Sequence, residues 1–165
     1  MVISQPLFLT NSSANQAAFM VRLQGLNLSP IAYQLMHSDE GSIWSQQQIN
    51  EAIAAYKQFL FLIYCYPNQP LVPTEAIDRV WHHHVLDTQK YAEDCQFLFN
   101  RFIHHFPYFG IRGEGDRQQW QTAVTKTQAL FQEHFGVELN PTSGFMDCQP
   151  LWNGADMLRP QPCSL

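Results

Sequence analysis

Residues 71–110 read LVPTEAIDRVWHHHVLDTQKYAEDCQFLFNRFIHHFPYFG, and this stretch decides the fold. It holds five of the seven histidines in a chain of 165 residues. Thr74 is suited to cap a helix, and Asp87 is suited to cap a second one directly after it. Apolar residues recur at helical spacing after each cap, at Ile77, Val80, Trp81 and Val85 and then at Tyr91, Cys95, Leu98 and Phe102. The pattern predicts a helical hairpin with a tight turn, whose second helix reaches His104 and His105 before Pro107 ends it.

Two long helices are predicted outside this hairpin. Ser45 and Gln48 have the spacing of a capping box, ahead of a periodic run that proline ends at Pro67. Asp116 with Gln119 has the same spacing, ahead of a helix that we expect to stop at a glycine, residue 136.

Shorter helices are predicted at residues 15–23 and from Ser29-Pro30 to about residue 38, because a serine before a proline favours a helix start. No segment shows the period-two alternation of a strand. The predicted fold class is therefore all-α, a compact bundle of four main helices plus one or two short ones around the central hairpin. We expect one domain over residues 1–165, with an ordered core at about 28–136 and an irregular tail at 137–165.

Composition and charge exclude several classes of protein. The chain is 45% apolar and 14% charged, which is typical of a folded domain. A net charge of −5 with scattered basic residues gives no footprint for nucleic acid. No apolar run is long enough to span a membrane, and no signal peptide is evident, so we expect a soluble cytoplasmic protein. The four cysteines form no CxxC pair and are expected to stay thiols.

The candidate site lies at the closed end of the hairpin. Antiparallel pairing about Asp87 places His84 opposite Tyr91, and Trp81 opposite Asp94 and Cys95. Histidine, carboxylate and thiolate together suit zinc or another transition metal. The candidate ligands are His82, His84, Asp94 and Cys95, with Asp78 orienting His82 and Tyr91 in support. His104 and His105 are an alternative pair of ligands.

Other interpretations of the same residues stay open. His82 and His84 lie on nearly opposite sides of an ideal helix, so both serve one site only if the helix loosens before Asp87. The spacing matches no standard zinc motif. In the alternative interpretation, His84 is a core histidine bonded to Asp94 or Tyr91, and Trp81 serves as packing. Cys95 as a nucleophile with His84 as base is a further reading, but no oxyanion hole is apparent.

A family resemblance rests on the same residues. The pattern D-x-x-W-H-x-H-x-L followed by Y-x-x-D-C runs from Asp78 to Cys95, and HHFPYFG follows it. With the earlier WS…YKQFL…YP…P, these residues resemble the glycine-rich domain-containing protein-like family over about residues 30–135. The resemblance implies an all-helical domain and, for plant members, a link to stress and development, but no reaction. A glycine-rich tail is missing, since only two of the eight glycines follow Gly136.

Two hypotheses for function follow, and neither specifies a reaction. The first is a metal-binding protein with the ligands named above. The second is a non-catalytic module that binds an unknown protein partner, in which those residues form a buried polar network and the aromatic loop at residues 106–111 docks the partner.

Overall fold

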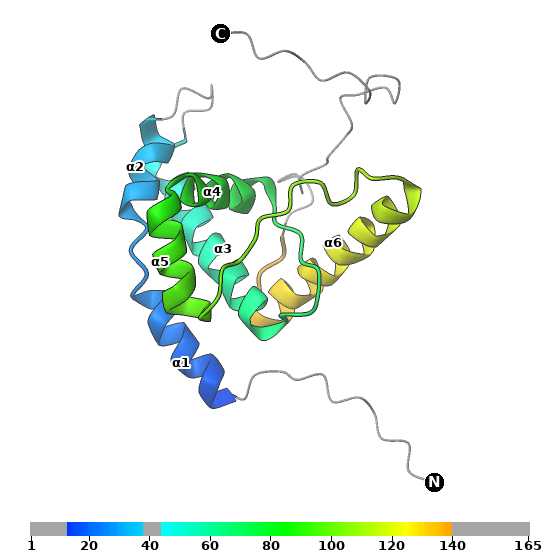
Figure 1. The fold of residues 1–165 in the computed structure, drawn as a ribbon, viewed down its shortest axis with the longest axis horizontal. Helices are drawn as coiled ribbons and strands as arrows, with labels where there is room; N and C mark the ends of the chain where they lie inside the picture. Colours follow the sequence, from blue (N-terminus) through cyan, green and yellow to red (C-terminus); the bar gives the residue numbers. More distant parts are fainter. Residues whose placement is uncertain (1–12, 38–43, 140–165) are drawn as a thin grey trace.

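The computed structural model describes residues 13–37 and 44–139, and all regular structure there is helical (Figure 1). The helices are α1 (Ser13–Gln24), α2 (Ser29–His37), α3 (Gln46–Cys65), α4 (Glu75–Leu86), α5 (Thr88–Phe99) and α6 (Glu114–Phe135). No strand occurs in these two ranges. The predicted all-α class is confirmed. Most of the predicted tail, residues 140–165, lies outside the described residues.

Helix α3 is the element on which the bundle is assembled. It contacts α1, α2, α4 and α6, and Figure 1 shows α2 and α6 on opposite sides of it. The predicted capping box starts it: Gln48 N donates to Ser45 Oγ at 3.2 Å, and Ser45 N donates to Gln48 Oε1 at 2.8 Å. The helix buries residues on more than one face, namely Ile49, Ala52, Tyr56, Phe59, Leu60, Phe61, Leu62 and Cys65. Burial on more than one face is what a central helix requires.

Helices α4 and α5 meet at a turn of one residue, Asp87, as the spacing predicted. The Thr74 hydroxyl caps α4 by accepting from Ile77 N at 3.3 Å. The Asp87 side chain makes no cap hydrogen bond, although its position is the expected one. In Figure 1 the two helices form a corner and do not lie side by side. Because of this corner, the side chains that face each other differ from those of the predicted antiparallel pairing.

The predicted end of α5 was wrong. The helix stops at Phe99, because Asn100 takes a left-handed conformation with φ of 54° that ends it. Asparagine tolerates this conformation better than most residues do. The chain after Asn100 turns back without helical structure, with Ile103 buried and Phe102 48% exposed. His104 and His105 therefore lie on a returning segment and not on the helix.

Helix α6 begins at Glu114, earlier than the predicted start at Asp116. The Asp116 carboxylate faces backwards and accepts from Gly110 N at 2.7 Å and from Arg112 N at 3.2 Å. It closes the preceding loop and does not cap the helix. The predicted stop is confirmed, since Gly136 has φ of 65° at the C-terminal end. No helix in the described part of the chain is both long and apolar enough to cross a membrane.

Candidate functional site

A buried polar network occupies the corner between α4 and α5. The His84 side chain is 1% exposed, and each of its ring nitrogens has a protein partner. Nδ1 lies 3.0 Å from the Tyr56 hydroxyl, and Nε2 lies 2.9 Å from Asp94 Oδ2. Lys90 Nζ donates to the same carboxylate oxygen at 2.8 Å. A neutral imidazole satisfies this arrangement, because Nε2–H donates to Asp94 and Nδ1 accepts from Tyr56.

Burial favours the uncharged forms of His84, Tyr56 and Cys95. It lowers the pKa of His84, against the hydrogen bond and charge of Asp94, which raise it. Burial also raises the pKa of Tyr56 well above its usual value, and that of the Cys95 thiol. Cys95 is 3% exposed. A buried thiol with a raised pKa is a poor nucleophile and a poor metal ligand, because both roles need the thiolate.

Trp81 and Tyr91 extend the network along the corner. Trp81 Nε1 donates to the Tyr91 hydroxyl at 2.9 Å, and that hydroxyl donates to the carbonyl of Ile103 at 2.6 Å. The expected approach of His84 to Tyr91 is present, with ring centres 4.9 Å apart. The structure does not pair Trp81 with Asp94. Because the helices form a corner, hydrogen-bonded partners are ten residues apart in the sequence.

The four candidate metal ligands are not brought together. His82 is exposed on α4, which stays regular to Leu86 and does not loosen. Asp78 does not orient His82, since its Oδ1 lies 2.7 Å from Nε2 of His105. Within residues 13–37 and 44–139, no group of three or more His, Cys, Asp or Glu side chains could hold a metal ion. The metal hypothesis stays a prediction.

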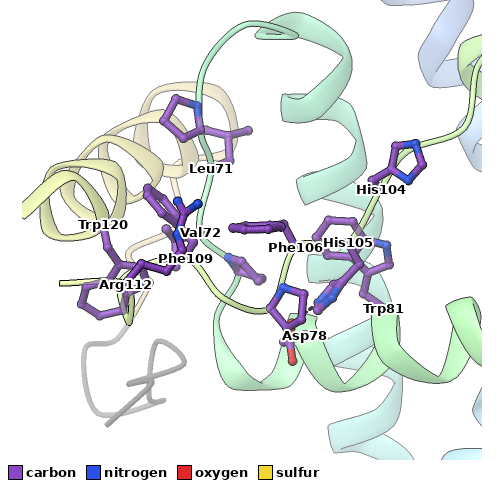
Figure 2. Close-up of a pocket in the computed structure, with 13 residues that line it drawn as sticks. Leu71, Val72, Asp78, Trp81, His104, His105, Phe106, Phe109, Arg112 and Trp120 are labelled. Carbon is purple, nitrogen blue, oxygen red and sulfur yellow. Dashed lines mark hydrogen bonds and ion pairs between the residues drawn. The ribbon is translucent and has the colours of Figure 1, made fainter. Parts of the chain in front are cut away.

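A second site is a pocket of about 280 Å³ that sequence reasoning only partly anticipated. It lies between the segment before α4, the loop after α5 and the start of α6 (Figure 2). Its walls are mostly proline and aromatic side chains: Pro70, Leu71, Val72, Pro73, Trp81, Phe106, Pro107, Phe109 and Trp120. Its polar side chains are Asp78, His104, His105 and Arg112. The aromatic loop was recognised in the sequence, but the other walls of the pocket were not.

The pocket contains a fixed carboxylate and imidazole pair. The side chains of His105 and Asp78 are 15% and 12% exposed, and their hydrogen bond is 2.7 Å long. The ring of His105 packs nearly perpendicular to that of Trp81, with ring centres 4.6 Å apart. Of the alternative pair of histidine ligands, His105 bonds to Asp78, while the ring of His104 packs against Phe102 with ring centres 5.1 Å apart.

The loop is held against α6 by Arg112 and Asp116. Arg112 Nη2 donates to Asp116 Oδ1 at 2.7 Å, and this hydrogen bonding lowers the pKa of Asp116. The guanidinium also lies 5.0 Å from the centre of the Phe106 ring. Gly110 packs so closely against Trp120 that a Cβ at Gly110 would lie 2.8 Å from Trp120 Cγ. These contacts give the pocket a defined wall.

Comparisons with known proteins place the chain in a family. The UCP032817-like family model matches residues 23–132. Two proteins of Arabidopsis thaliana are similar to the chain. Glycine-rich domain-containing protein 1 is 34% identical over 113 residues, and glycine-rich domain-containing protein 2 is 30% identical over 112 residues.

Each alignment covers 66% of this chain but only 13% and 14% of the two relatives. No solved structure matches the chain significantly. The helical fold, the family model and the relatives agree: this chain belongs to the UCP032817-like family and is related to the glycine-rich domain-containing proteins.

Proposed function

We propose that the chain is a non-catalytic protein-interaction module whose aromatic pocket receives an apolar side chain of a partner protein. The observation that carries the proposal is the exposure of large aromatic residues on the loop that lines the pocket. Phe106 is 53% exposed and Tyr108 is 57% exposed, although the loop that carries them is held by defined contacts. Aromatic side chains beside a preformed pocket are the usual anchors of a protein interface.

The size of the pocket supports a side chain as the ligand. Its volume of about 280 Å³ lies just below the range for small-molecule sites, which is roughly 300–1,000 Å³. One or two side chains suit this space better than a nucleotide or a flavin does. The walls are preformed, which reduces the entropic cost of binding.

The buried network supports a structural role at the other candidate site. Tyr56 and His84 are 0% and 1% exposed, so a substrate has no approach to their polar atoms. Their hydrogen bonds join α3 to α4, and that of His84 to Asp94 joins α4 to α5. The network thereby holds the corner that positions Trp81, a wall of the pocket. The relatives support a module as well, since the matched region is a small part of each.

Selection from a library of displayed random peptides tests the proposal. We expect peptides that bind the wild-type chain to lose binding at least tenfold to the Phe106→Asp variant, because a carboxylate at the pocket opposes apolar burial. Phe97→Asp is the matched control, since Phe97 on α5 is also 53% exposed but lies outside the pocket. Equal binding by both variants would show that the pocket is not the docking site.

A further inference from the structure

We infer that the pocket selects an aromatic side chain that carries a hydrogen-bond donor, and that the preferred side chain is tryptophan. Nδ1 of His105 accepts the hydrogen bond from this donor. The inference rests on the proposed function and names the chemistry of the partner. It follows from the pair of Asp78 and His105. Among the polar side chains that line the pocket, these two are the most enclosed.

Asp78 sets the tautomer of His105. An ionised carboxylate only accepts hydrogen bonds, so the contact of 2.7 Å between Asp78 Oδ1 and His105 Nε2 requires a proton on Nε2. In the neutral imidazole the lone pair then lies on Nδ1, which takes no part in this pair. His105 lines the pocket, and we assign this lone pair to a ligand bound there.

The position of the His105 ring is fixed from a second side. The ring packs nearly perpendicular to the indole of Trp81, and this indole is itself held, because Trp81 donates to Tyr91 and Tyr91 donates to the Ile103 carbonyl. Trp81 is 6% exposed and cannot move aside without opening the core. An acceptor held in this way binds a donor without first losing conformational freedom.

The walls select for an aromatic guest. Trp120, Phe106 and Phe109 line the pocket together with three prolines. Aromatic pairs contribute about 0.5–1.5 kcal/mol beyond the burial of their area. A phenylalanine gains this contact but leaves the acceptor on His105 without a donor, which is unfavourable in an enclosed site. An indole meets both requirements through its apolar ring and its N–H group.

Three capped peptides test the inference, identical except for a central tryptophan, 1-methyltryptophan or phenylalanine. The methyl group removes the donor and keeps the indole ring. We expect the wild-type chain to bind the tryptophan peptide about tenfold more tightly than either of the others in calorimetric titrations, which is the usual effect of one hydrogen bond.

Variants then assign the preference to one atom. His105→Phe keeps a ring beside Trp81 but removes the acceptor, so it should bind the tryptophan and 1-methyltryptophan peptides equally. Asp78→Asn should also lose the preference, because an amide can donate to Nε2 and move the proton to Nδ1. His37→Phe, on α2, is the control and should keep it. Thermal unfolding of each variant shows whether it is folded.

The outcomes separate this inference from the proposed function. Equal affinity of the wild-type chain for the tryptophan and 1-methyltryptophan peptides, with both lost in Phe106→Asp, would overturn the inference and leave the module intact. Binding only of selected peptides without an aromatic residue would do the same. No binding by any peptide would overturn both. Self-association that Phe106→Asp abolishes would place a second copy in the pocket and also overturn the inference.

Discussion

A single residue, His84, makes the stability of this fold depend on pH. Burial in the folded state lowers the pKa of His84, so the folded chain holds the imidazole neutral. In the unfolded chain the imidazole is protonated below about pH 6.5. The unfolded state therefore binds more protons below that pH, and the free energy of unfolding should fall as the solution is acidified. The limiting slope for one proton is about 1.4 kcal/mol per pH unit.

Urea unfolding between about pH 7 and pH 5 measures this effect. We expect the wild-type chain to lose stability over this range, and a His84→Gln variant to be less stable at pH 7 but to lose less on acidification. His37→Gln is the control, because His37 is exposed and should leave the slope unchanged. Parallel pH profiles for the wild-type and His84→Gln chains would contradict the account.

Individual contacts were predictable only where they are local. The inward position of His84 followed from helical spacing, and Asp94 was named as a partner because it lies on the next helix. Tyr56 could not be named, since it lies 28 residues from His84 on α3. The same holds for His105 and Asp78, which are 27 residues apart. Contacts of this kind depend on how the helices pack, and no local pattern records that.

Among the elements, helix starts with a side-chain cap were predicted best. Ser45 and Thr74 cap α3 and α4 as expected, because a capping hydroxyl acts within one turn. The end of α5 was missed, because Asn100 stops the helix through its backbone conformation while apolar spacing continues to Phe102. The start of α6 was misplaced, because the Asp116 carboxylate binds the preceding loop.

Two nearby glycines should respond oppositely to alanine. Gly110→Ala should lower the free energy of unfolding by more than about 1 kcal/mol, because Gly110 has φ of 94° and its new Cβ would meet Trp120. Gly115→Ala should raise it by about 0.5–1 kcal/mol, since Gly115 lies in the first turn of α6 with open space around it.

Chemical denaturation of both variants checks this prediction, and Trp120 fluorescence reports on the pocket wall. A neutral effect of Gly110→Ala would mean that the loop does not press on Trp120 as described. Destabilisation by Gly115→Ala would mean that the helix starts later than Glu114, which would also remove the reason for Asp116 to face the loop.

At the scale of the whole molecule, the all-α class followed from the sequence but the pocket did not. Besides Asp78 and Trp81 on α4, its walls come from three segments, at residues 70–73, at 104–112 and at Trp120. Each segment is rich in proline or aromatic residues, which is a local signal. Their meeting depends on the early end of α5, which sends the chain back towards α4 instead of extending the helix.

The metal hypothesis is also tested on the whole molecule. We expect EDTA to leave the melting temperature of protein purified without a histidine tag unchanged, because both ring nitrogens of His84 already have protein partners. Elemental analysis should then find no stoichiometric metal. A metal that disappears in His84→Ala or Asp94→Asn would restore the predicted site, and one that depends on His104 and His105 would favour the alternative site.

The central claim is that the pocket is where a partner docks, and nuclear magnetic resonance tests it most directly. A selected peptide, titrated into the isotope-labelled chain, should shift the backbone amides of residues 104–112 and the indole N–H of Trp120, while those of α1 and α2 stay unchanged. Shifts centred on α1 or α2, with the Trp120 indole unaffected, would contradict the claim.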